Sequence, residues 1–450
     1  MKIIRFLNFE FINKNYLDLG NTFFLIGVFF LPSALPIGGI FLLISIVISF
    51  NNNKENFLND KWNFILFICI ILIILGTLYS SIINPSREIL DLNKSTIWLN
   101  LFNWVPIYFA FIGFQSYLRS EKQKLLFQKF LIAGTVPVIA SCIIQIFFNI
   151  YGPFETLFGT IVWFNYDLNL EQLQRATGLF NNPNYLGMWM TICLPFSITA
   201  LKLEKKNLLR SFFLIILNIL IIYFALKTYS RNALIGILIS FLFLIDKKKL
   251  IYFTILFFLS FFIFSYLLPN FLNMSPLESI NLSQFRTLEK LTSVNLNLNQ
   301  PRIAIWSNAI KFISMRPMLG WGPGTFPNVF LENAYLKIPL TQYQHTHNLI
   351  IELAYNFGIP IAILISTTVI NLFVKAFNKI KKINKSSQYY FLSQPVLTSL
   401  SIFFVAHITD ITYYDGKISI IFALLLASLK NIIDENIEIK NNENYLLKAK

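Results

Sequence analysis

Long apolar blocks alternate with short polar segments along most of the chain. A helix of about 20 apolar residues spans the ~30 Å hydrocarbon core of a bilayer, so each block predicts one membrane-crossing helix. We expect an all-α polytopic membrane protein with about twelve transmembrane helices. The expected spans are residues 18–33, 36–50, 62–83, 97–117, 125–149, 184–201, 209–227, 232–245, 250–268, 348–374, 391–409 and 417–430.

The first two blocks are short and share a turn marked by Pro32 and Pro36. A proline can kink a helix as well as separate two helices. One kinked span is therefore an alternative to two spans, and it would reverse the orientation of every later segment.

Basic residues indicate the orientation, because cytoplasmic loops of membrane proteins carry an excess of Lys and Arg. With the N-terminus in the cytoplasm, 25 of the 37 Lys and Arg residues fall on the cytoplasmic side. Six of the other 12 lie in one long loop, where this bias has little meaning. We expect twelve spans in the cytoplasmic membrane, with both termini cytoplasmic.

Composition agrees with this picture: 55% of the 450 residues are apolar, 13% are charged, and the mean hydropathy is +0.60. The net charge of +15 is explained by orientation and by contact with anionic membrane lipids, so a nucleic-acid partner is not expected. Cys69, Cys142 and Cys193 fall within apolar spans, which predicts buried thiols without disulfides or a zinc site. The first apolar block lacks a signal-peptide cleavage pattern, so we expect the N-terminus to be retained.

The organisation predicted is a single membrane domain, 1–450, interrupted by two sizeable outward loops. The first covers about residues 150–183. The second, residues 269–347, lies between the ninth and tenth spans and is much longer than a connector requires. Long loops in compact proteins are usually functional.

Within the second loop, Pro301 begins a pattern typical of a short amphipathic helix that could lie on the bilayer surface. Arg316-Pro317 should end it. A turn with three glycines, Gly320, Gly322 and Gly324, follows. Its backbone N–H groups could bind phosphate oxygens, although a plain loop tip explains these glycines equally well. The apolar face predicted for the helix comprises Ile303, Trp306, Ala309, Ile310 and Ile313.

Candidate chemical groups gather on the outward side. His345 and His347 end the long loop, Arg302 begins its helix, Arg231 precedes the eighth span, and Arg175 precedes the sixth. Arginine suits a diphosphate because its planar guanidinium donates two parallel hydrogen bonds and stays charged. For Arg231, an interfacial side chain that only reaches toward water is the alternative.

These segments resemble the O-antigen ligase and polymerase superfamily. The resemblance rests on Arg231 before an apolar span, on residues 301–306 (PRIAIW) and 316–324 (RPMLGWGPG), and on His347-Asn348 with Gly358 after nine intervening residues. It spans roughly residues 175–360. Members are integral-membrane glycosyltransferases that move a glycan from a polyprenyl diphosphate carrier to a lipid- or protein-linked acceptor, as in lipopolysaccharide biosynthesis.

The resemblance implies that His347 is the catalytic residue and that Arg231 and Arg302 bind the diphosphate, with Arg175 a weaker correspondence. It implies no cofactor. Ligase and polymerase differ in the acceptor, and neither the acceptor nor the sugar can be read from these loops.

The chemistry is consistent with the residue types. Histidine, with a reference pKa of about 6.5, can remove a proton from an acceptor hydroxyl at neutral pH. His345 competes with His347 for this role, and Glu352 is a secondary candidate for orienting the base. The outward loops lack an Asp pair at metal-ligand spacing, so we expect a metal-independent, inverting transfer.

A rival interpretation is a multipass transporter of a small anion such as inorganic carbon. It rests on His407, Asp410 and Asp415, which could form an ion relay at a helix end. Few charges occur within the spans, and no internal repeat is evident. A capped helix end explains His407 and Asp410 more simply.

Overall fold

The computed structural model describes residues 17–52, 58–82, 94–167, 169–170, 173–204, 207–244, 301–334 and 343–435. Their regular secondary structure is helical apart from two small hairpins, β1 (Phe154–Thr156) with β2 (Ile161–Trp163) and β3 (Asn169–Leu170) with β4 (Leu173–Gln174). The chain forms two compact units, residues 1–134 with 296–450 and residues 135–295. The prediction of an α-helical polytopic membrane protein is confirmed, and the hairpins are an addition in the first loop.

Eight described helical stretches are long and apolar enough to cross a bilayer, and three shorter apolar helices accompany them. Twelve spans therefore remains a prediction, and the expected span 250–268 lies outside the described residues. The eight are Lys61–Ile82 (α3), Ile97–Gln115, Glu121–Phe147 (α6), Pro183–Leu203 (α7), Leu208–Lys227 (α8), Ile359–Ile380 (α16), Gln388–Ala406 (α17) and Gly416–Asp434 (α18). The stretch Ile97–Gln115 combines parts of α4 (Lys94–Asn100), η1 (Leu101–Asn103) and α5 (Val105–Gln115).

The first two predicted blocks are two helices, Leu17–Phe30 and α2 (Leu35–Asn52). They approach closely at Gly27 and Gly38, where a Cβ on Gly38 would lie 3.0 Å from the Gly27 carbonyl oxygen. The alternative of one kinked helix is therefore wrong.

The expected span 348–374 is also two helices, α15 (Leu349–Phe357) and α16. Gly358 separates them with a φ of +89°, and Pro360 lies in the first turn of α16. A Cβ at Gly358 would lie 2.2 Å from the Met318 carbonyl oxygen, so the sharp turn requires glycine there. The membrane-crossing stretch consequently begins with α16, later than predicted.

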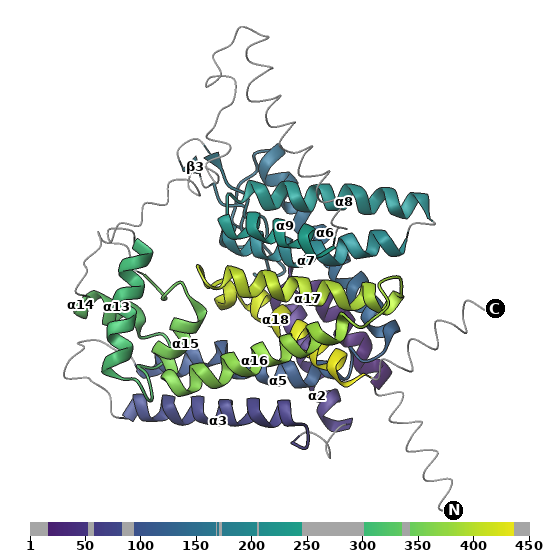
Figure 1. Cartoon of the computed structure of the whole chain (residues 1–450). Helices are drawn as coiled ribbons and strands as arrows, with labels where there is room; N and C mark the ends of the chain where they lie inside the picture. Colours follow the sequence, from purple (N-terminus) through teal and green to yellow (C-terminus); the bar gives the residue numbers. More distant parts are fainter. Residues whose placement is uncertain are drawn as a thin grey trace, which may run out of the picture. The chain divides into compact units, whose positions relative to one another are not determined.

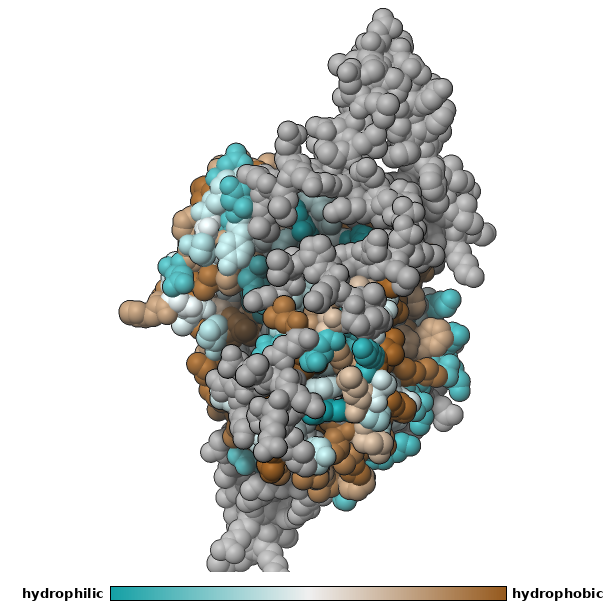
Figure 2. Space-filling model, turned by 90° about the vertical axis from the view of Figure 1, so that its left-hand side faces the viewer, coloured by the Kyte–Doolittle hydropathy of each residue, from teal (hydrophilic) through white to brown (hydrophobic). Residues whose placement is uncertain are grey.

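In the first unit, α18 packs against α5, α16 and α17, and α16 also packs against α3 (Figure 1). In the second unit, α7 packs against α8 and α9 (Arg231–Leu244), and Gly187 permits a close approach to Ala233. In α18, 83% of the apolar stretch is buried, whereas in α8 the share is 17%. The exposed apolar side chains of α8 are those expected of a helix that faces lipid. Figure 2 shows hydrophobic side chains (brown) reaching the surface beside hydrophilic ones (teal).

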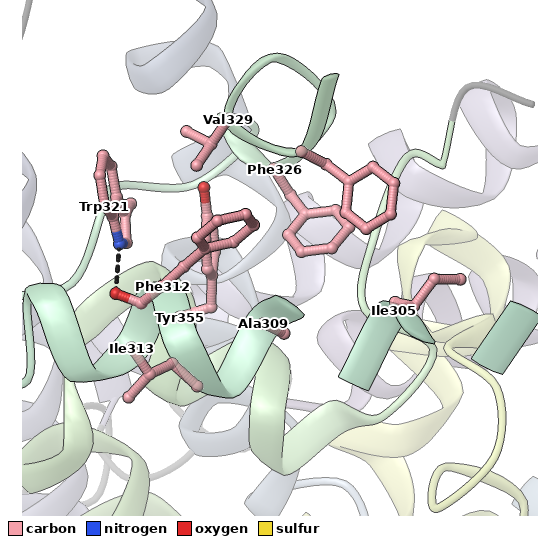
Figure 3. Close-up of a cluster of buried hydrophobic side chains, with 9 residues drawn as sticks. Ile305, Ala309, Phe312, Ile313, Trp321, Phe326, Val329 and Tyr355 are labelled. Carbon is pink, nitrogen blue, oxygen red and sulfur yellow. Dashed lines mark hydrogen bonds between the residues drawn. The ribbon is translucent and has the colours of Figure 1, made fainter. Parts of the chain in front are cut away.

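The predicted amphipathic helix is α13 (Pro301–Met315), which ends just before Arg316-Pro317 as expected. The predicted apolar face is only partly right, because Ala309 and Ile313 are buried but Ile310 is 58% exposed. Ile305 and Phe312 are buried in its place. Tertiary packing against α14 (Phe326–Asn333) and α15 selected this slightly rotated face (Figure 3).

The glycine turn serves this packing. Gly320, Gly322 and Gly324 all have positive φ, and the N–H groups of Trp321 and Gly322 donate to the carbonyl oxygens of Tyr355 and Asn356 at 2.8 and 3.0 Å. The Trp321 indole N–H donates to the Phe312 carbonyl at 2.7 Å (Figure 3). These two backbone amides are therefore bound to α15 and are not free for phosphate oxygens.

Candidate active site

The start of α15 positions the histidine pair. Asn348 is the N-cap, and its side-chain oxygen accepts from the N–H groups of Ile350 and Ile351, both at 3.0 Å. Its side-chain nitrogen donates to the Ile408 carbonyl at 2.9 Å, and the Leu349 N–H donates to the His407 carbonyl at 3.0 Å. The end of the long loop is thus tied to the connection between α17 and α18.

His347 precedes this cap with a φ of +55°, which is uncommon for a residue with a side chain. Such backbone strain persists only where the surrounding structure imposes it, and it concentrates at functional sites. The Asn348 cap on one side and the Thr346 contacts on the other impose it here.

The imidazole of His347 pairs with Asp410, with Nδ1 and Oδ1 3.0 Å apart. The His347 side chain is 26% exposed and that of Asp410 is 9% exposed. Burial alone would raise the pKa of Asp410, but the hydrogen bond and charge of His347 and the charge of Arg302 bring the pKa down to about 2. A carboxylate only accepts hydrogen bonds, so Nδ1 of His347 carries the proton. In the neutral imidazole, the Nε2 lone pair is then available as a base.

His345 lies against this pair. Its Nδ1 accepts from the His347 backbone N–H at 3.2 Å, and the two rings are 4.3 Å apart. Burial, followed by repulsion from His347, lowers the pKa of His345 to about 4. Three potential ligand atoms, one each from His345, His347 and Asp410, all lie within 4.8 Å of one another. These three residues could therefore hold a metal ion.

Glu352 supports the turn that carries the histidines. It is 1% exposed, and its carboxylate accepts from the Thr346 backbone N–H at 2.9 Å, from the Tyr414 hydroxyl at 2.5 Å and from the Asn356 amide at 3.2 Å. These contacts hold the residue before His347 rather than its imidazole. Glu352 therefore acts on His347 only indirectly, through the backbone.

The arginines are divided between the units. Arg302 is the second residue of α13, in the unit that holds the histidines, and lies close enough for its charge to lower the pKa values of Asp410 and His345. Arg231 begins α9 in the second unit. There, Nε of Arg175 donates to the Thr228 carbonyl at 2.9 Å, and burial lowers the pKa of Arg175. The approach of Arg231 and Arg175 to His347 stays a prediction.

Sequence reasoning did not assign Asp410 to His347, although it noted the carboxylate at this helix end. The signal was an acidic residue directly after an apolar span, on the side where the histidines were expected. His407 is buried, and its Nδ1 lies 2.7 Å from the Phe403 carbonyl oxygen.

An apolar cavity of about 320 Å³ lies within the first unit and is lined by residues of α3, α5, α15, α16, α17 and α18. Leu353, Val369 and Phe403 are among the side chains that form its wall, and Asn348 and His407 also line it. Asn348 directly follows His347 in the chain, so the cavity reaches the residue next to His347. The cysteine on this wall, Cys69, is buried and free, as are Cys142 and Cys193, which confirms the expectation of buried thiols.

Comparison of the sequence with known proteins gives a family match and a similar protein. Residues 214–366 match the family model described as O-antigen ligase. This range contains Arg231, Arg302, His345, His347 and Glu352 but neither Arg175 nor Asp410.

The chain is also similar to the ComP-specific O-oligosaccharyltransferase of Acinetobacter baylyi, with 26% identity over 225 residues. The similarity covers 48% of this chain and 38% of that relative, so the chain matches well under half of the relative's length. The resemblance inferred from the arginine, glycine and histidine motifs is thus confirmed. This multipass membrane protein matches the O-antigen ligase family across residues 214–366.

Proposed function

We propose that the protein transfers a glycan from a polyprenyl diphosphate carrier to an acceptor hydroxyl at the outer face of the cytoplasmic membrane. The observation that carries this proposal is the hydrogen-bonded His347–Asp410 pair beside an apolar cavity. A carrier of this kind has a charged head and a hydrocarbon chain, and the site offers a base and an apolar space next to each other.

In the proposed reaction, Nε2 of His347 accepts the proton of the acceptor hydroxyl as its oxygen attacks the anomeric carbon. The bond from that carbon to the diphosphate oxygen breaks, and the polyprenyl diphosphate leaves with the electron pair, so the configuration inverts. Asp410 keeps the proton of His347 on Nδ1 and stabilises the imidazolium that forms. General-base assistance of this type contributes about 10²- to 10⁴-fold.

Arg302 and Arg231 are proposed to bind the diphosphate and to stabilise the charge of the leaving group, with Arg175 as a weaker candidate. Arginine cations can do this without a divalent metal, so chelators should not lower the rate. Arg302 is the better supported, because its charge already acts on Asp410 and His345.

The relatives favour ligase-like transfer over polymerisation. The matching family model is described as a ligase, and the similar Acinetobacter baylyi protein is named as an oligosaccharyltransferase specific for ComP. We infer that this chain likewise passes an oligosaccharide to a lipid- or protein-linked acceptor rather than to a second carrier-linked unit.

Deletion of the gene followed by gel analysis of surface glycans tests the proposal. Carrier-linked chains that accumulate without attachment to an acceptor would support ligase-like transfer, and loss of long chains with single units accumulating would indicate a polymerase. Unaltered glycans would contradict both. Reporter fusions test the orientation: a fusion after Pro276 should lie outside the cytoplasm and one after Lys382 inside it, and a cytoplasmic reporter at both would place the histidines in the wrong compartment.

A further inference from the structure

The cluster formed by His345, His347 and Asp410 has the donor set of a transition-metal site. Two imidazole nitrogens and one carboxylate oxygen are a typical three-ligand set for Zn²⁺, which keeps a fourth position for water or substrate. Imidazole ligands favour Zn²⁺, Co²⁺ and related ions over Mg²⁺ and Ca²⁺, which prefer oxygen ligands. The 26% exposure of His347 leaves an approach to the cluster from outside.

The distances are close to those of a tetrahedral site. Zinc bonds of about 2.1 Å place neighbouring ligand atoms about 3.4 Å apart. Nδ1 of His347 and Oδ1 of Asp410 are already 3.0 Å apart, and the ligand atoms of all three residues lie within 4.8 Å. Side-chain rotations that shorten the longest separation between ligand atoms, which is at most 4.8 Å, to about 3.4 Å would close the set around an ion.

The surrounding contacts hold two of the ligands in place. The Ile411 N–H donates to Asp410 Oδ1 at 3.0 Å, and the His345 ring lies 5.7 Å from the Tyr414 ring. Tyr414 in turn donates to the buried Glu352. Hydrogen-bonding partners, such as the Ile411 N–H here, orient metal ligands and commonly strengthen a site.

We propose that a zinc-type divalent ion binds His345, His347 and Asp410 and thereby inhibits glycan transfer. This inference rests on the proposed role of His347 as the base. An ion on Nδ1 of His347 takes the place of the proton shared with Asp410, and that proton moves to Nε2. With Nε2 protonated, the imidazole no longer accepts a proton from an acceptor hydroxyl, although the donor still binds.

The binding test uses the full-length protein in detergent, purified with a tag free of histidine and treated with chelator. Titration with Co²⁺ should show one ion per chain with the visible absorption of a four-coordinate site. His345→Ala and Asp410→Asn should each weaken binding at least about 10-fold. Glu155→Gln, which removes an exposed carboxylate outside the cluster, is the matched control and should bind as the wild type does.

The same samples then test inhibition. Zn²⁺ should lower wild-type transfer over the concentration range in which it binds, and His345→Ala should need at least about 10-fold more Zn²⁺ for the same fractional loss of its own metal-free rate. Mg²⁺ at equal concentration should have no effect.

Three results would overturn the inference: no saturable binding, equal affinity in both cluster variants and the wild type, or binding at the cluster without inhibition. Transfer that is lost on chelation would contradict both the inference and the metal-independent mechanism. Cluster-dependent binding in a protein with no transferase activity at all would instead leave the metal site standing and reject the proposed function.

Discussion

Replacement of Asp410 by asparagine removes the negative charge that faces His347 and leaves a side chain of nearly the same size. In the native pair, Oδ1 accepts from Nδ1 of His347 at 3.0 Å. The asparagine amide can instead turn its N–H₂ group toward Nδ1, and the imidazole proton would then move to Nε2. We expect Asp410→Asn to impair the base without disturbing the binding of the donor.

The expected magnitude follows from the hydrogen bond. A bond with one charged partner contributes about 1.5 to 3 kcal/mol, and about 1.36 kcal/mol corresponds to a tenfold change in rate. Loss of this interaction in the transition state should therefore lower kcat by about 10- to 10²-fold, and a change of tautomer would lower it further. KM for the carrier-linked donor should stay near the wild-type value, because the lost interaction strengthens only as the imidazolium forms.

The assay measures initial rates of glycan transfer in proteoliposomes supplied with carrier-linked donor and acceptor. Asp415→Asn is the matched control, since Asp415 lies five positions further along the same connection and caps α18 through the N–H groups of Lys417 and Ile418. Asparagine caps a helix about as well as aspartate, so this variant should keep its rate, although it loses some stability because the negative charge that faces the buried Lys417 is removed.

A wild-type kcat in correctly folded Asp410→Asn would refute the reasoning, because the pair at 3.0 Å would then have no part in proton transfer. A rise in KM with unchanged kcat would place Asp410 in donor binding. Equal losses in Asp410→Asn and Asp415→Asn would indicate damage to the connection between α17 and α18.

His347→Ala should abolish transfer while donor binding persists, and His345→Ala should have a milder effect. Measurements of the initial rate and of donor binding test both expectations, and transfer by the double variant would exclude histidine from the mechanism. Lysine in place of Arg302 or Arg231 keeps the charge but loses the planar guanidinium, so transfer should fall at least ~10-fold. Alanine should approach the ~10²- to 10³-fold loss of rate typical of one missing donor. Wild-type rates in both lysine variants would show that the two arginines are ordinary interfacial cations. Asn348→Asp should keep the helix cap but lose the hydrogen bond to Ile408, whereas Asn348→Ala loses both and about 1 kcal/mol of stability; equal melting temperatures of the two variants would count against the cap.

Local pattern was sufficient for most of the helices. Apolar length predicted the eight described membrane-crossing stretches, and Pro301 and Arg316-Pro317 correctly bounded α13. The same pattern failed for the residues before α16, because an apolar run does not reveal the positive φ that Gly358 adopts against the backbone of Met318. It also selected Ile310 for the buried face of α13, since the apolar residues of that helix extend around more than one face.

The candidate site shows the same division between what local sequence reveals and what only tertiary packing decides. Residue types and spacing were enough to single out His345, His347 and Arg302, because few side chains can accept a proton at neutral pH or bind a diphosphate. Glu352 was noted as a candidate, but its place five positions after His347 does not reveal that its carboxylate accepts a hydrogen bond from the Thr346 N–H.

By itself, the sequence determined that this chain crosses a membrane and that its histidines lie where a polar loop meets an apolar helix, because composition and periodicity are properties of short segments. Only the tertiary structure decided that Asp410 is the partner of His347. The two residues are 63 positions apart, and they meet because Asn348 and Leu349 bind the carbonyl oxygens at the end of α17. A pairing at that separation depends on how helices pack, and no local pattern of residues encodes it.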